Sequence, residues 1–130
     1  FIWLTLFVLI AGTIVTGSGP HAGDERAQRF GFDPRVVSWL HADLVIALLV
    51  LTSMLFLLTR QIGLTIINKR VGLFLLICLS QGLVGYVQYF TGLPVVLVAI
   101  HLLGATLVWV SGWSLLKVAD SGFKLKGFHL

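Results

Sequence analysis

Charged residues are scarce in this chain, and their scarcity is the first indication of its class. Asp, Glu, Lys and Arg make up 11% of the 130 residues, whereas about a quarter is usual in a soluble domain. Apolar residues take their place and reach 58% of the chain. These values predict a membrane protein, and they leave no segment for a soluble domain or for a basic arm that binds nucleic acid.

Cysteine is nearly absent as well. The single cysteine, Cys78, excludes an intrachain disulfide and a metal site built from thiolates. It stands in an apolar run, where we expect a small buried residue. The chain opens on an apolar run without a charged segment before it, which does not fit a signal peptide. We interpret this run as a span already under way, in a chain whose upstream part is missing.

The apolar runs predict an all-α protein, a transmembrane four-helix bundle with up-down-up-down topology. We expect spans at residues 1–17, 36–59, 71–91 and 94–117, a polar loop at 18–35 and a tail at 119–130. Asp33-Pro34 predicts the start of the second helix, because Asp caps helices and Pro suits the first turn.

The basic residues predict the orientation. The connection after the second span carries Arg60, Lys69 and Arg70 with no acid, and the tail also has an excess of lysine. The loop at 18–35 and the turn at 91–94 have no net charge. Since basic loops stay inside, we expect the chain start and the tail to be cytoplasmic and the 18–35 loop to be extracellular.

Two histidines stand out because ionisable residues inside a membrane are costly and usually functional. His41 is about five residues from the outer surface and His101 about seven, so that their depths differ by about 3 Å. Their spans, the second and the fourth, are diagonal neighbours in an up-down bundle. Asp43 is turned about 200° away from His41 and cannot face the same partner; we expect it to reach water or a neighbouring span.

A metal-centred planar ligand would fit between two such imidazoles, and haem iron takes axial histidines. We therefore expect His41 and His101 to ligate a haem iron. Two alternatives stay open. The histidines can be core hydrogen-bonding residues, or they can belong to a copper or zinc site, which needs three or four ligands and for which His21 is the only further candidate.

Residues at the same depth would surround such a haem. Gly104, three residues after His101, would leave room for a porphyrin face. Gln88 shares one face of the third span with Gln81 and Gly85. Haem carboxylates would project outward, where Arg35, Arg26 and Arg29 are the nearest candidates to meet them.

Several motifs resemble those of a known family. TGSGPHAGD at 16–24, LHADL at 40–44, QGLVGYVQYFTGLP at 81–94 and HLLGATLVW at 101–109 are together similar to the C-terminal half of haem A synthase, most closely of the actinobacterial type. The resemblance implies eight spans in two halves, with haem b bound by a histidine pair in the second half. His41 and His101 match that pair.

The resemblance also implies what the chain lacks. In the family the first half oxidises the methyl group of haem O to the formyl group of haem A, with a glutamate shortly before its histidine and often a cysteine pair. No acid precedes His41 at 37–40, and Cys78 is mid-span. We therefore expect a haem-b half that passes electrons and is not catalytic alone.

The implied partners are the bilayer of a bacterial cell membrane, the N-terminal substrate half and haem O synthase, with a homo-oligomer as a further possibility. The alternative functions are a stand-alone membrane b-type cytochrome and a non-haem scaffold or transporter half. Many such cytochromes hold two haems and need four core histidines, whereas only two histidines of this chain lie in spans.

Overall fold

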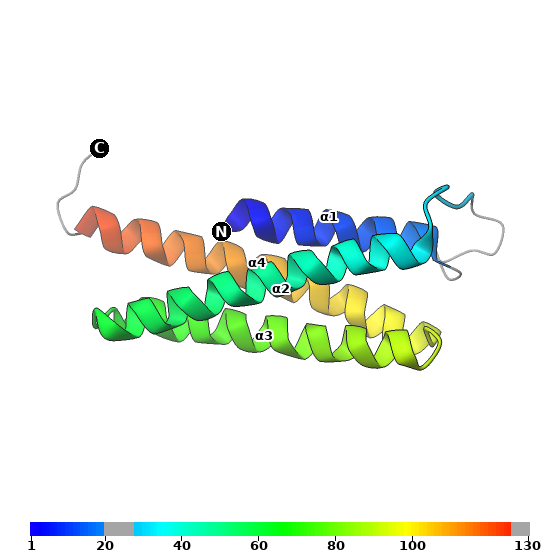
Figure 1. Cartoon of the computed structure of the whole chain (residues 1–130). Helices are drawn as coiled ribbons and strands as arrows, with labels where there is room; N and C mark the ends of the chain where they lie inside the picture. The colour runs from blue at the N-terminus through cyan, green and yellow to red at the C-terminus, as the bar shows by residue number, and fades with distance from the viewer. Residues whose placement is uncertain (20–27, 126–130) are drawn as a thin grey trace.

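The fold consists of four α-helices joined by one long and two short connections (Figure 1). The computed structural model describes residues 1–19 and 28–125, with side chains as far as Ser121. The helices are α1 (Ile2–Ser18), α2 (Pro34–Gln61), α3 (Thr65–Phe90) and α4 (Val95–Leu125). The predicted all-α, four-helix architecture is confirmed.

The start of α2 follows the predicted capping. The side chain of Asp33 accepts hydrogen bonds from the backbone N–H groups of Arg35 and Val36 at 2.8 and 3.2 Å, and Pro34 occupies the first turn. These contacts satisfy two of the N–H groups that a helix start leaves unpaired. The cap fixes where α2 begins, and with it the depth of every residue in the helix.

Two helices extend beyond the predicted spans. The third begins at Thr65 and not at residue 71, and the fourth continues to Leu125, past residue 117. Hydropathy marks where a segment leaves the hydrocarbon, whereas backbone hydrogen bonding continues into the polar region. The connection between α2 and α3 is therefore short, and it turns at Gly63, whose φ is 72°.

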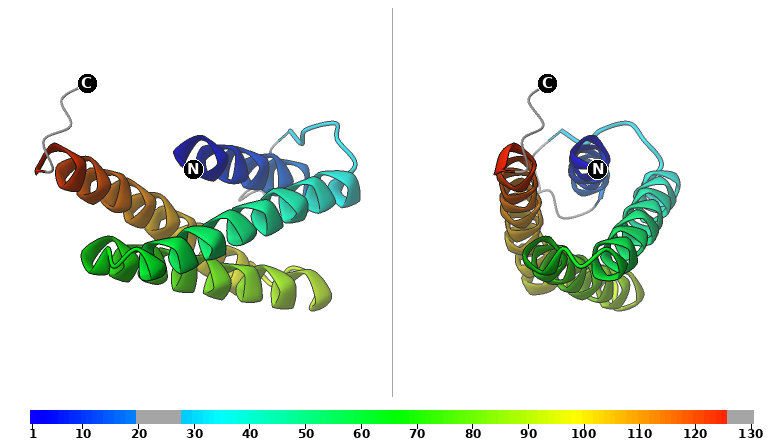
Figure 2. Two further views of the ribbon diagram at one scale, coloured as in Figure 1. Left: turned by 60° about the vertical axis from the view of Figure 1, so that its left-hand side comes forward. Right: turned by 90° about the vertical axis from the view of Figure 1, so that its left-hand side faces the viewer.

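The helices surround a common axis in chain order, which Figure 2 shows in its right-hand view along the bundle. Consecutive helices pack against each other, and α1 closes the ring against α4 through the least extensive contact. Within the described residues, the diagonal pairs α1/α3 and α2/α4 bring no Cα atoms within 8 Å of each other. The second and fourth helices are thus diagonal, as predicted.

Three helices are long and apolar enough to cross a membrane, namely Pro34–Gln61, Thr65–Phe90 and the Val95–Ser121 part of α4. The apolar α1 is shorter, with 17 residues, and runs beside the half of the bundle nearest the 18–35 loop. Large apolar side chains cover the outside of the bundle, as lipid contact requires.

A compact core fills the interior away from that loop. It contains Val8, Leu48, Phe74, Cys78 and Val108, and Phe74 is completely buried. The burial of Cys78 confirms the expectation for this residue. Leu48 and Val108 lie seven residues, or about two helical turns, further along their helices than His41 and His101. This apolar core therefore packs below the histidines, on the side of the bundle away from the 18–35 loop.

Candidate functional site

The two histidines lie at nearly the same depth on diagonal helices. His41 is eight residues after Asp33, and His101 is seven residues after Pro94; the carbonyl groups of Asp33 and Pro94 accept hydrogen bonds at the starts of their helices. One residue of difference corresponds to about 1.5 Å along a helix. The match is closer than the sequence indicated, because the capping residues fix both helix starts.

Each imidazole lies against a glycine of the preceding helix. A Cβ atom placed on Gly12 of α1 would be 3.1 Å from Cε1 of His41, and one placed on Gly85 of α3 would be 3.2 Å from Cε1 of His101. Any larger residue would push the rings, because ordinary carbon contacts are about 3.5–4.0 Å. Each glycine therefore forms a cradle for one ring, Gly12 for His41 and Gly85 for His101.

Both rings hold an unused polar atom. Nδ1 is buried and makes no hydrogen bond in either His41 or His101. His41 is near enough to His101 for charges on the two rings to interact. Since buried polar atoms are normally paired, these two nitrogens indicate a missing partner between the helices.

A cavity of about 180 Å³ lies on the loop side of the histidines. All four helices line it, and its polar lining residues include Thr16, Arg35, Ser38 and Gln88. Thr16 is four residues from Gly12 in α1. Ser38 is three residues from His41 in α2, and Gln88 is three residues from Gly85 in α3. The cavity is therefore one helical turn outward from the ring layer.

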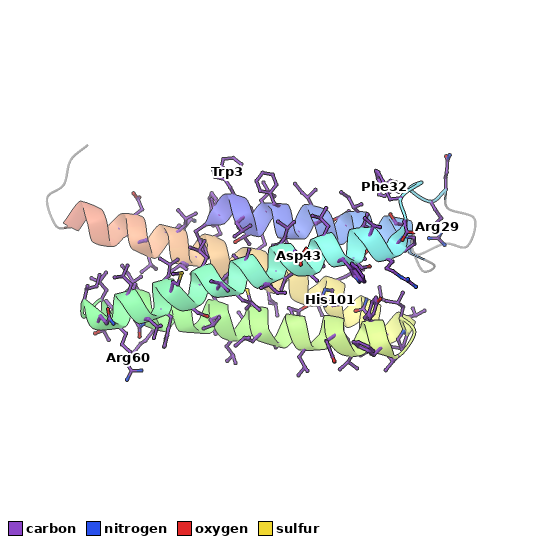
Figure 3. The ribbon with its side chains drawn as sticks, viewed as in Figure 1. Trp3, Arg29, Phe32, Asp43, Arg60 and His101 are labelled. Carbon is purple, nitrogen blue, oxygen red and sulfur yellow. The ribbon has the colours of Figure 1, made fainter. Side chains whose placement is uncertain are left out.

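The structure brings two of the predicted site residues to one cavity, outward from the histidines. Arg35 and Gln88 line the cavity, and Oε1 of Gln88 is buried without a hydrogen-bond partner. His101 lies on the yellow part of α4, between the ribbons of α2 and α3 in the view of Figure 3. His21, the further ligand candidate for a copper or zinc site, and Arg26, a candidate for the haem carboxylates, lie outside the described residues.

Gly104 has a different neighbour from the one expected. The side chain of Gln81 occupies the space that a Cβ atom of Gly104 would need. The absence of a side chain at this buried position therefore makes room for an amide of α3, and not for an open face beside His101. Oε1 of Gln81 is itself buried without a hydrogen-bond partner, so this pair adds a further polar group to the interior.

Sequence reasoning missed Gly12. It precedes the end of α1 by six residues, which places it at the depth of the histidines. Gly12 is four residues before Thr16, and Gly85 is three residues before Gln88 in α3. In both helices a glycine at the depth of the histidines is therefore about one turn from a polar residue of the cavity. This parallel was a signal present in the sequence, but only the packing of α1 on α2 shows which ring the glycine faces.

The residues present fit a planar metal complex with two axial positions. The donor set is two imidazoles at one depth, each with a glycine cradle and an unpartnered buried nitrogen. In the part of the chain that the structure describes, no three His, Cys, Asp or Glu side chains come together. Haem iron takes two axial histidines and obtains its other four ligands from the porphyrin.

Comparison with known proteins adds no family to this geometry. No protein-family model, no curated protein and no solved structure matches the chain.

Proposed function

We propose that His41 and His101 bind a haem b, and that this four-helix unit is the haem-b half of a haem A synthase. The observation that carries the proposal is the pair of buried, unpartnered Nδ1 atoms on diagonal helices at one depth. A bound haem would supply one-electron chemistry at its iron. The family assignment depends on the sequence motifs given above.

The protein groups have distinct parts in this proposal. A histidine that binds a metal uses one ring nitrogen and usually donates the other N–H to a carbonyl or carboxylate. Gly12 and Gly85 hold the rings in position, because each ring packs closely against the glycine of the preceding helix. The two imidazoles bind as neutral ligands, which suits an interior without water.

The outer cavity suits the carboxylates of a haem. Arg35 offers a guanidinium group, and Ser38, Thr16 and Gln88 offer uncharged hydrogen-bonding groups. The carboxylates would therefore point toward the 18–35 loop, and the apolar ring edge would face the core. In this arrangement Gly104 contributes indirectly, by admitting Gln81.

The unit would pass electrons while an N-terminal half oxidises the haem O methyl group. It would act in a bacterial cell membrane, with the 18–35 loop outside and the tail in the cytoplasm, and haem O synthase would be a partner that supplies substrate. The apolar exposed surface and the length of three helices support the membrane setting. The unit alone would not catalyse the reaction.

Absorption spectroscopy tests the haem proposal. The chain expressed with ample haem should show a six-coordinate, low-spin spectrum. His41→Ala and His101→Ala should each abolish or convert it, whereas His129→Ala, outside the spans, should leave it unchanged. A wild-type protein without a Soret band, or alanine variants with the wild-type spectrum, would contradict the ligand assignment.

Haem extraction tests the pathway. Deletion of the gene in its native host should remove haem A and accumulate haem O, as chromatography of extracted haems would show. The wild-type gene should restore haem A, and the His101→Ala gene should not. A deletion strain with normal haem A would refute the pathway while leaving haem binding to the spectroscopic test.

A further inference from the structure

The end of the bundle away from the 18–35 loop is basic. α3 begins there and α4 ends there (Figure 1). The charged residues from position 60 to position 121 are Arg60, Lys69, Arg70, Lys117 and Asp120. Four positive charges thus stand against one negative charge, a net charge of +3. No Asp, Glu, Lys or Arg lies between Arg70 and Lys117, so these two residues mark the boundary between hydrocarbon and headgroups.

A hydrogen bond joins α3 and α4 at this boundary. Nη1 of Arg70 donates to Oγ of Ser114 at 3.4 Å. Within the described residues, Ser114 is the one hydrogen-bond partner of this guanidinium group. An arginine has five N–H donors in a planar fork. Most of the donors of the exposed Arg70 side chain are therefore available to a further acceptor beside Ser114.

The hydroxyl group of Ser114 also keeps a donor. The other hydroxyl residues of α4 with described side chains donate to backbone carbonyl groups three or four residues earlier; they are Thr106, Ser111 and Ser121. Ser114 accepts a hydrogen bond from Arg70 and donates to no group among the described residues. Its O–H group can therefore donate to the same acceptor as the guanidinium group.

Lys117 adds a second cation to this contact. It is exposed and follows Ser114 by three residues, which places it on the same face of α4, one turn further along. The Cα–Cβ bonds of a helix tilt toward its N-terminus, so the Lys117 side chain extends back toward Ser114. Within the described residues, no hydrogen bond or ion pair occupies its ammonium group. Two cations and one hydroxyl donor thus share one surface position.

We propose that Arg70, Ser114 and Lys117 bind the phosphate of an anionic phospholipid. Phosphate oxygens accept hydrogen bonds from a guanidinium fork and from a hydroxyl group, and headgroups supply phosphates at the depth of these residues. Two protein cations favour a lipid without a positive group in its headgroup. Basic sites between membrane helices on the cytoplasmic side suit anionic lipids, and the orientation proposed above places the site on that side. The proposal does not depend on haem binding.

The apolar surface beside the site suits the acyl chains of such a lipid. Leu73 is about one turn from Arg70 along α3, and Val110 is about one turn from Ser114 along α4. Their side chains are 48 and 63% exposed. Trp113 directly precedes Ser114 and is also exposed, as is usual for tryptophan at the level of the headgroups. A lipid held by its phosphate would therefore lay its acyl chains against apolar side chains of both helices.

Native mass spectrometry tests the selection of the headgroup. The full chain, released from vesicles with equal amounts of phosphatidylglycerol and phosphatidylcholine, should retain one phosphatidylglycerol. Arg70→Gln and Lys117→Gln should each weaken its binding about fivefold, the usual effect of one cation at an anionic surface. Lys69→Gln is the matched control, because it removes the same charge at the same depth but is turned about 100° from Arg70.

Three outcomes would overturn the proposal. The first is equal retention of the two lipids, or of neither. The second is an equal loss of phosphatidylglycerol in Lys69→Gln and Arg70→Gln, which would show that general charge and not this site attracts the lipid. The third is displacement of the lipid by inorganic phosphate at millimolar concentration, which would assign the site to a free anion.

Tryptophan quenching locates the bound lipid independently. Phosphatidylglycerol with brominated acyl chains should quench the fluorescence of the chain more than equally brominated phosphatidylcholine. Trp113→Phe should remove much of this excess, because Trp113 adjoins the site. Trp39→Phe is the control, because Trp39 is also exposed but lies near the other end of the bundle. An excess that disappears in Trp39→Phe and persists in Trp113→Phe would place the lipid at that other end and refute the assignment.

Discussion

Gly85→Ala is the substitution that examines the ring cradle most directly. The added methyl group would be 3.2 Å from Cε1 of His101. An ordinary carbon contact is about 3.5–4.0 Å, so the imidazole must move by roughly 0.3–0.8 Å. Binding sites hold their groups to within about 0.5 Å. The substitution should therefore displace the ring from the position that a shared iron requires.

Gly82→Ala is a matched control on the same helix. A Cβ atom on Gly82 has nothing within 4 Å, so alanine should stabilise α3 by about 0.5–1 kcal/mol through helix propensity. Gly85→Ala brings the same propensity but adds an overpacking cost of about 1–3 kcal/mol. The two variants should differ by that cost in the free energy of unfolding, and Gly85→Ala should bind haem about tenfold more weakly.

Three measurements separate the contributions. Unfolding in mixed micelles reports the free energy without haem, and titration of the haem-free protein, followed at the Soret band, reports affinity. Electron paramagnetic resonance of the ferric form reports the orientation of the axial rings. If Gly85→Ala matches Gly82→Ala in all three measurements, the glycine does not control the position of His101 and the cradle argument fails.

Three further substitutions address other parts of the bundle. Arg35→Gln should weaken haem binding about three- to tenfold in the same titration, because it removes a cation from the outer cavity, while Arg60→Gln at the opposite end of α2 should have no effect. Gly104→Ala should cost about 1–3 kcal/mol of unfolding free energy through overlap with Gln81, and the addition of Gln81→Ala should recover most of it; additive losses would contradict the contact. Asn68→Leu should cost about 1–3 kcal/mol, because its side-chain amide donates hydrogen bonds at 2.8 and 3.0 Å to α2, and an unchanged unfolding curve would show that these bonds contribute nothing.

The positions of the histidines could be predicted from sequence because they depend on local signals. Asp33-Pro34 and Pro94 mark helix starts, and counting residues from those starts gives the depths of His41 and His101. Short connections make neighbouring helices antiparallel, which makes the second and fourth diagonal. The expected grouping of Arg35 with Gln88 followed from depth in the same way and agrees with the cavity lining.

Contacts between helices could not be predicted in this way, because they depend on how each helix is rotated about its axis. Gly104 illustrates the limit, since its spacing from His101 suggested space beside the ring, whereas the packing of α3 places Gln81 there. Gly12 illustrates the opposite error, because its spacing from Thr16 does not show that the glycine faces the ring of His41. Helix ends beyond the hydrocarbon, as in α3 and α4, also escape a reading based on hydropathy.

The pairing of each histidine with a glycine of the preceding helix has a consequence for biosynthesis. Each hairpin, α1–α2 or α3–α4, contains one complete ring-and-glycine unit. A nascent chain that has inserted the α1–α2 hairpin but not the α3–α4 hairpin therefore presents one of the two proposed ligands, and the second arrives only when residue 101 has left the ribosome. Binding of the proposed haem by both histidines would accordingly report that the α3–α4 hairpin has docked onto the α1–α2 hairpin.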